Sequence, residues 1–88
     1  MATVFIPGPL REYSGGRDRV DVPGGSLRRV FESLDIECPG IAAELIVDDG
    51  IRPGIAVFID DEQTSSGLIQ RVPDDGQVRL LPALGGGC

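Results

Sequence analysis

Residues 26–34, SLRRVFESL, carry the clearest helical pattern in the chain. Their apolar side chains recur at i, i+3, i+4 and i+7, which places them on one face of a helix: Leu27, Val30, Phe31 and Leu34. Ser26 is a natural N-cap. The helix is expected to end before Pro39, because the residue preceding a proline disfavours the α conformation. The pattern therefore predicts one amphipathic helix packed on a core.

Two strands are expected before this helix. Residues 3–6, TVFI, are β-branched or aromatic, and Pro7 closes them. Residues 19–22, RVDV, alternate strictly, with both valines directed inward. A long loop that contains Gly15 and Gly16 connects the two strands. The segment therefore predicts a hairpin.

Three further strands are expected after the helix. Residues 55–59 and 77–82 have alternating apolar residues, and Leu68-Ile69 is predicted to be a short edge strand. Residues 41–46 are long enough only for a helical turn. The predicted fold is α+β of β-grasp (ubiquitin-like) type, a mixed sheet of four to five strands with one main helix on one face. The first and last strands would be central and parallel. A ferredoxin-like fold would need a second full helix.

The residue inventory argues against an enzyme. The 88 residues fit one domain, and we divide them into a β-grasp domain at 1–82 and a flexible, glycine-rich tail at 83–88. The chain has no His, and all eight of its basic residues are Arg. The usual general base, the commonest metal ligand and Schiff-base chemistry are therefore missing. We expect no catalytic residue, no metal and no cofactor bound by this chain.

The net charge of −6 argues against a nucleic-acid partner, whose phosphates require a basic surface. The N-terminal residues lack the pattern of a signal peptide, and no apolar run reaches membrane-spanning length. With only two cysteines, we expect a cytoplasmic protein without a disulfide framework, and most simply a monomer.

The C-terminal tail is the remaining candidate for chemistry. Gly85, Gly86 and Gly87 carry no Cβ, so this segment fits a slot too narrow for side chains and presents a main-chain carbonyl to another protein. An unstructured terminus without a role is the alternative.

The whole chain resembles the ubiquitin-like sulfur carriers of the MoaD/ThiS superfamily, and most closely the CysO-type carriers of cysteine biosynthesis. The resemblance rests on VFIP at 4–7, on FIDDE at 58–62 and above all on the final strand followed by glycines at 78–87. The family's diglycine falls on Gly86-Gly87, with Gly85 at an alanine position.

This resemblance implies a mechanism for the tail. A ubiquitin-activating-type enzyme would adenylate Gly87 with ATP and magnesium, and sulfide or a persulfide would displace AMP to leave a thiocarboxylate. In the cysteine branch, a cysteine-synthase-like enzyme with pyridoxal phosphate would receive the sulfur. A zinc-dependent JAMM-type metallopeptidase would then release the product.

Cys88 departs from the family pattern, because a residue after Gly87 turns its carboxyl group into an amide that is not adenylated. Three interpretations stay open. Cys88 is an encoded extension that the JAMM-type peptidase removes, or the cysteine product still attached, or a cysteine engineered for labelling.

Other residues have weaker assignments. An apolar docking patch for the activating enzyme is predicted from Leu10, Phe58 and Leu81. The sequence is equally compatible with an interpretation in which Phe5 and Phe58 simply cover that face of the sheet. The acidic residues 60–62 are expected to be a solvated run of charges rather than a docking feature or a set of Ca²⁺ ligands. Cys38 is expected to be a buried structural residue.

Two other classes of function remain open at this stage. A ubiquitin-like modifier would use the same carboxyl group to form isopeptide bonds, whereas a pure interaction domain would not need its tail. Within the carriers, the acceptor alternatives to cysteine are molybdopterin, thiamin and secondary metabolites.

Overall fold

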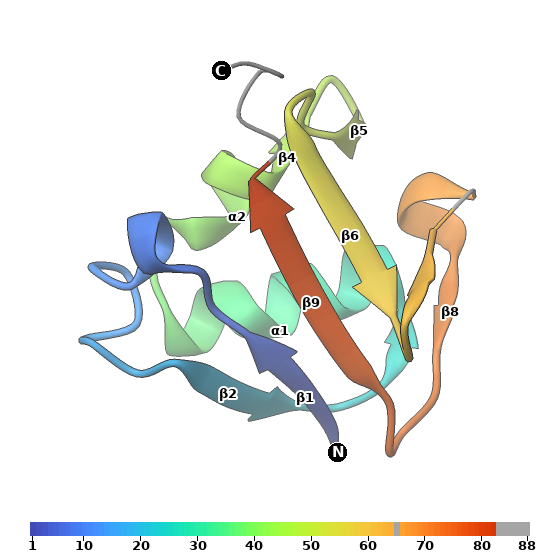
Figure 1. Cartoon of the computed structure of the whole chain (residues 1–88), viewed down its shortest axis with the longest axis horizontal. Coiled ribbons are helices and arrows are strands. Elements are labelled where there is room, and N and C mark those ends of the chain that lie inside the picture. Colours follow the sequence, from blue (N-terminus) through green and yellow to red (C-terminus); the bar gives the residue numbers. More distant parts are fainter. Residues whose placement is uncertain (65, 83–88) are drawn as a thin grey trace.

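The computed structural model describes residues 1–64 and 66–82 of the 88. Its main feature is a five-stranded mixed sheet with the strand order β2-β1-β9-β6-β7 (Figure 1). The five strands are β1 (Ala2–Phe5), β2 (Arg19–Val22), β6 (Ile55–Ile59), β7 (Glu62–Gln63) and β9 (Gln77–Pro82). A 3-10 turn, η1 (Gly8–Leu10), lies in the long connection between β1 and β2.

The central strands have the arrangement expected of a β-grasp fold. β1 runs parallel to β9, with Thr3 opposite Gln77 and Phe5 opposite Arg79. On its other side β9 is antiparallel to β6, and its last residue, Pro82, lies opposite Ile55. The prediction of a central, parallel pair formed by the first and last strands is confirmed, and so is the mixed sheet with one main helix.

The main helix, α1 (Leu27–Glu37), covers one face of the sheet. The Ser26 hydroxyl caps it by accepting a hydrogen bond of 3.3 Å from the Arg29 amide. Its four predicted apolar residues are fully buried, and each has no exposed surface: Leu27, Val30, Phe31 and Leu34. Because no other helix of the described chain lies on the opposite face, that face is open to solvent in Figure 1.

The core consists of this helix face and the inward residues of the strands. The residues predicted to form the sheet side of the core are buried, whereas Ile55, on the same face of β6, is only partly buried. The buried residues are Val4, Ile6, Val20, Val22, Val57, Ile59, Val78 and Leu80. A second, short helix, α2 (Ile41–Leu45), adds the buried side chains of Ile41 and Leu45. Asp35 of α1 fixes its start, because one carboxylate oxygen accepts hydrogen bonds from the Gly40 and Ala42 amides at 3.0 Å each.

The prediction of a strand at Leu68-Ile69 is wrong. These residues belong to a 3-10 turn, η2 (Gly67–Ile69), in which Leu68 is buried and Ile69 is 81% exposed. The turn begins with Gly67 in the left-handed region, at φ 63°, which an extended strand does not allow. A short strand, β8 (Arg71–Val72), begins shortly after this turn and pairs with β3 (Gly25–Ser26) in a small separate sheet.

Two pairs of adjacent aspartates form tight hairpin turns. Asp60 and Asp61, at φ 51° and 72°, connect β6 to β7. Asp48 and Asp49, at φ 53° and 60°, connect β4 (Ile46–Val47) to β5 (Gly50–Ile51). Positive φ at both central residues is the signature of a type I′ turn, in which aspartate is tolerated better than most side chains. Sequence alone did not indicate either hairpin.

No helix among the described residues is long and apolar enough to cross a membrane.

Candidate functional site

The candidate site is the C-terminal end of β9 together with the sheet face around it. β9 is hydrogen-bonded on both sides, to β1 and to β6, so it is a fixed base for the residues that follow. Gly85, Gly86, Gly87 and Cys88 themselves lie outside the described residues. The structure therefore describes the strand that precedes the predicted tail.

The open face of the sheet, defined here by Phe5, Phe58, Arg79 and Leu81, forms a continuous surface next to that base. Arg79 lies opposite Phe5 on one neighbouring strand and opposite Phe58 on the other. Its guanidinium carbon is 4.6 Å from the centroid of the Phe5 ring, which is the geometry of a cation–π contact. Leu81, two residues further along β9, is 50% exposed. Aromatic, aliphatic and cationic groups thus meet on one face.

The charge of Arg79 is only weakly paired within the chain. Its nearest carboxylate oxygen belongs to Asp61, at 3.9 Å from Nε, and the Asp61 side chain is 90% exposed. An exposed pair at this distance contributes little free energy. The Arg79 guanidinium is therefore available to a carboxylate of another protein, although the chain as a whole carries a net charge of −6.

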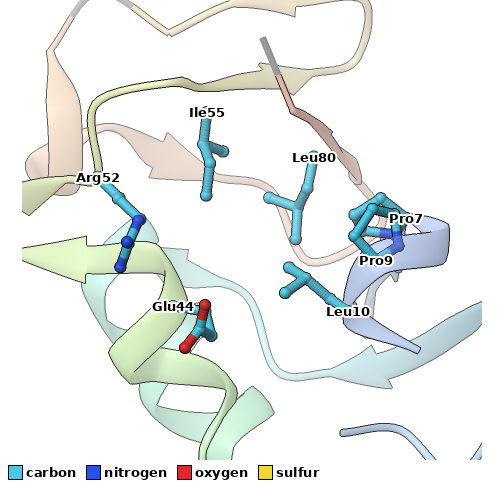
Figure 2. Close-up of a pocket in the computed structure, with 7 residues that line it drawn as sticks. All are labelled: Pro7, Pro9, Leu10, Glu44, Arg52, Ile55 and Leu80. Atoms are coloured by element: carbon cyan, nitrogen blue, oxygen red, sulfur yellow. The ribbon is translucent and has the colours of Figure 1, made fainter. Parts of the chain in front are cut away.

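Leu10 does not share this face with Phe58 and Leu81. It is half-buried against the core and lines a recess with Ile55 and the buried Leu80, on the side of the sheet that α1 covers (Figure 2). The recess has a volume of about 90 Å³ and lies between η1, α2 and the end of β9. The structure therefore brings Phe58 and Leu81 onto one face and places Leu10 on the other.

The described arginines differ in their position relative to the open face. Arg11 lies beside Phe5, Arg79 and Leu81 in a shallow groove on the open face, where its Nε donates a 3.1 Å hydrogen bond to the Ile6 carbonyl. Arg28 lies on the outer side of α1, 3.6 Å from the Asp49 carboxylate. Arg11 and Arg79 are therefore the two described arginines that line this groove.

The acidic run after β6 has a structural role. Asp60 accepts a hydrogen bond of 2.9 Å from the Gln77 amide, and its own amide donates one of the same length to the Gln77 carbonyl. These bonds attach the turn to the start of β9. Within residues 1–64 and 66–82 there is no group of three or more His, Cys, Asp or Glu able to hold a metal ion.

Cys38 is fully buried at the end of α1, as expected of a structural residue. Burial raises the pKa of its thiol because it disfavours the thiolate, while the nearby Arg17 guanidinium acts in the opposite direction. Arg17 Nη2 lies 4.0 Å from the sulfur and also donates to the Glu37 carbonyl at 3.2 Å. A buried, protonated thiol is a poor nucleophile.

Comparison with known proteins agrees with this geometry. No family model matches the chain. The sulfur carrier protein CysO of Mycobacterium tuberculosis is 34% identical to it, over 97% of each chain. The crystal structure of M. tuberculosis CysO has a TM-score of 0.88 at 29% identity, covering 96% of this chain and 100% of that one. A chain of the Amycolatopsis orientalis BexX/CysO complex reaches 0.93 at 31% identity, covering 99% and 100%.

The β-grasp sheet, whose last strand is followed in the sequence by a run of three glycines at 85–87, defines a ubiquitin-like protein. The identity over nearly the whole length of both chains narrows this class: the chain belongs to the CysO family of sulfur carrier proteins.

Proposed function

We propose that this protein carries sulfur as a thiocarboxylate on Gly87 and donates it for cysteine biosynthesis. The observation that carries the proposal is the central position of β9, which Gly85-Gly86-Gly87 follow closely in the sequence, in a chain that belongs to the CysO family. The carrier contributes a fixed base, a docking face and the three glycines at 85–87, which have no side chains. The partner enzymes contribute the catalytic groups.

The chemistry follows from the weakness of a carboxylate as an electrophile. The Gly87 carboxylate attacks the α-phosphorus of ATP, releases pyrophosphate and becomes an acyl adenylate. Sulfide then adds to the carbonyl carbon, and AMP leaves with the bonding electron pair. If a persulfide adds instead, the product is an acyl disulfide, and a thiol of the partner enzyme must then attack its outer sulfur, which forms a disulfide and releases the thiocarboxylate. The resulting thiocarboxylate carries its nucleophile on sulfur. Because this chain has no His and no Lys, the activating enzyme supplies the acid, base and magnesium ligands.

Cys88 fits the last step of the same route. The thiocarboxylate sulfur adds to an enzyme-bound aminoacrylate, and the resulting thioester rearranges through a five-membered ring to a Gly87–Cys88 amide. A zinc-dependent JAMM-type peptidase then hydrolyses that amide to free cysteine. The same peptidase would also remove an encoded Cys88 before the first cycle. Both routes require Gly87 to become the terminal residue before it accepts sulfur.

The open face is the proposed docking surface for the activating enzyme. Phe5, Phe58 and Leu81 offer apolar area, and Arg79 offers a charge with only weak internal pairing. Aromatic and arginine side chains contribute most of the binding energy in protein interfaces. A partner with an apolar surface and a carboxylate facing Arg79 fits this arrangement, and the BexX/CysO complex shows that a relative of this chain binds a partner protein.

The test compares two chains, one ending at Gly87 and the other at Cys88, each incubated with ATP, sulfide and the cognate activating enzyme. Intact mass spectrometry should detect exchange of one oxygen for sulfur in the first chain only. Adding the peptidase should make the second chain competent. If the Gly87-ending chain never gains this mass while it is shown to bind the enzyme, the proposal is wrong.

The ubiquitin-like modifier remains the alternative, because the same activated Gly87 carboxyl would react with a lysine amine. Mass spectrometry of cell extracts distinguishes the two functions. Isopeptide bonds between Gly87 and lysines of other proteins would favour the modifier, and a terminal thiocarboxylate without such conjugates would favour the carrier.

A further inference from the structure

The outer edge of β2 is a row of backbone groups with which no strand of the described chain pairs. β2 is the first strand in the sheet order, so only its inner edge is bonded, to β1 (Figure 1). The ladder continues beyond the two strands, where the Ile6 amide donates a 2.8 Å hydrogen bond to the Asp18 carbonyl. Because the direction of these groups alternates along an antiparallel strand, the two valines of β2 bond to β1. Arg19 and Asp21 therefore direct their N–H and C=O groups outward.

Arg19 and Asp21 also carry the two charges of this strand. Their side chains are exposed on the face of the sheet opposite α1, where Arg19 lies opposite Phe5 in the register. One carboxylate oxygen of Asp21 accepts a 2.8 Å hydrogen bond from the Thr3 hydroxyl. Neither charge forms a salt bridge with another described residue. The same residues thus present unpaired backbone groups and opposite charges.

We propose that this edge binds the same edge of a second copy of the chain, with the two β2 strands antiparallel. A two-fold axis that places Val20 opposite its own symmetry mate also places Arg19 of each copy opposite Asp21 of the other. The residues of each such pair exchange both of their backbone hydrogen bonds, and a guanidinium lies beside a carboxylate. The two five-stranded sheets become one continuous sheet. A free strand edge is a template for this kind of pairing.

Charge selects this register among those that the backbone allows. Outward-directed residues must face outward-directed residues, so the register changes in steps of two positions. One shifted register places Arg19 opposite Arg19 of the second copy, and the other places Asp21 opposite Asp21. Like charges directly opposite each other are destabilising. Pro23 follows the strand and has no N–H to donate, so it limits the ladder at that end.

This dimer leaves the proposed site of each copy accessible. β9 is parallel to β1 and β1 is antiparallel to β2, so the C-terminal ends of the two β9 strands lie at opposite ends of the joined sheet. The two-fold axis also brings both open faces onto the same side, where they form one larger surface. The association itself does not depend on the sulfur chemistry proposed above.

The shortness of the ladder determines its strength. β2 has 4 residues, and a stable interface buries about 1,600 Å² in total. A ladder of this length is therefore expected to give a weak dimer that forms at high protein concentration. The monomer expected from the sequence then describes the dilute protein.

The first test is sedimentation velocity of the full chain from micromolar to millimolar concentration, in a Cys88→Ser background that excludes a disulfide at that position. The mean mass should rise toward that of a dimer. Arg19→Asp and Asp21→Arg each place like charges opposite each other, so each should weaken dimerisation about tenfold. An equal mixture of these two variants should associate again, because each copy offers the charge that the other lacks. Arg28→Asp makes the same charge change on the outer side of α1 and should leave dimerisation intact.

Amide hydrogen exchange identifies the edge itself. In the monomer the Arg19 and Asp21 amides face solvent, whereas the Val20 amide is bonded to β1. Raising the protein concentration should therefore slow exchange at Arg19 and Asp21 and leave Val20 unchanged. Urea denaturation midpoints establish that each variant is folded.

Three results would overturn the inference. The mass would stay that of a monomer up to millimolar concentration, or the mixture of Arg19→Asp with Asp21→Arg would associate no better than either variant alone. In the third, the added protection would appear at another edge, such as that of β7, instead of at Arg19 and Asp21.

Discussion

The two faces of the central sheet differ although the same strands build both. On the face toward α1, strand residues such as Val57 and Val78 are buried, together with Phe31 of the helix that covers them. On the open face, Phe58 is only half-buried, and Arg79 lies over the ring of Phe5. Because the side chains of a strand alternate, each strand contributes to stability with one set of residues and to recognition with the other. Substitutions on the buried face should therefore lower the free energy of unfolding, whereas those on the open face should weaken binding to a partner.

The largest effect is expected from Phe31→Ala. Removing a buried phenylalanine side chain leaves a cavity, so the free energy of unfolding should fall by about 3–5 kcal/mol. Urea denaturation measures this loss, and Phe58→Ala is the matched control on the open face. Equal losses for the two variants would contradict the difference between the faces.

A smaller effect, on binding, is expected from Arg79→Gln. Loss of the guanidinium should weaken binding to the activating enzyme about tenfold, which corresponds to roughly 1.4 kcal/mol. Titration calorimetry measures the affinity, and the midpoint of urea denaturation should be nearly unchanged. Arg28→Gln removes the same charge from the outer side of α1 and should leave binding intact. If both variants weaken binding equally, net charge rather than the open face controls association.

The hairpin turn beside the open face offers a gain in stability. Asp61 has φ 72°, a conformation that glycine adopts without steric cost, so Asp61→Gly should stabilise the protein by about 0.5 kcal/mol. Asp60→Gly is the control, because it also removes the hydrogen bond from the Gln77 amide and should cancel the gain. Denaturation midpoints compare the two, and a larger gain for Asp60→Gly would contradict the assigned role of its carboxylate.

The smallest effect concerns pH. Burial raises the pKa of the Cys38 thiol, so above the ordinary thiol pKa the unfolded chain loses a proton that the folded chain retains. The free energy of unfolding should therefore fall as the pH rises through this range. Denaturation at several pH values in a Cys88→Ser background measures the slope, and Cys38→Ala should reduce it. An unchanged slope would show that other groups cause it, such as Tyr13, whose pKa is raised by burial and by Glu44.

The fold was largely predictable because its signals are local. The helical period of α1 and the alternation in β2, β6 and β9 identify the core residues. One main helix between two pairs of strands is compatible with only a few sheet topologies. What was missed depends on long-range contacts. β8 pairs with β3 across 47 positions of sequence, from Val72 to Gly25, and a short strand of this kind has no pattern of its own. The two Asp-Asp hairpins were missed because their turns lack the glycine that usually indicates type I′ geometry.

The site was predictable in part. Alternation placed Phe58 and Leu81 on one face, and the structure agrees. Leu10 was grouped with them, but it lies in a turn, where alternation gives no information about direction. The contact of Arg79 with Phe5 joins residues that are distant in sequence, so it required the parallel register of β1 and β9.

The central position of β9 also determines how the protein responds to mechanical load. A partner that draws on the tail pulls along β9, which is bonded to β1 on one side and to β6 on the other. Along this axis the load shears both ladders together, whereas an edge strand would peel away one bond at a time. The domain can therefore be held by its C-terminal end under tension while its hydrogen-bonded core stays intact.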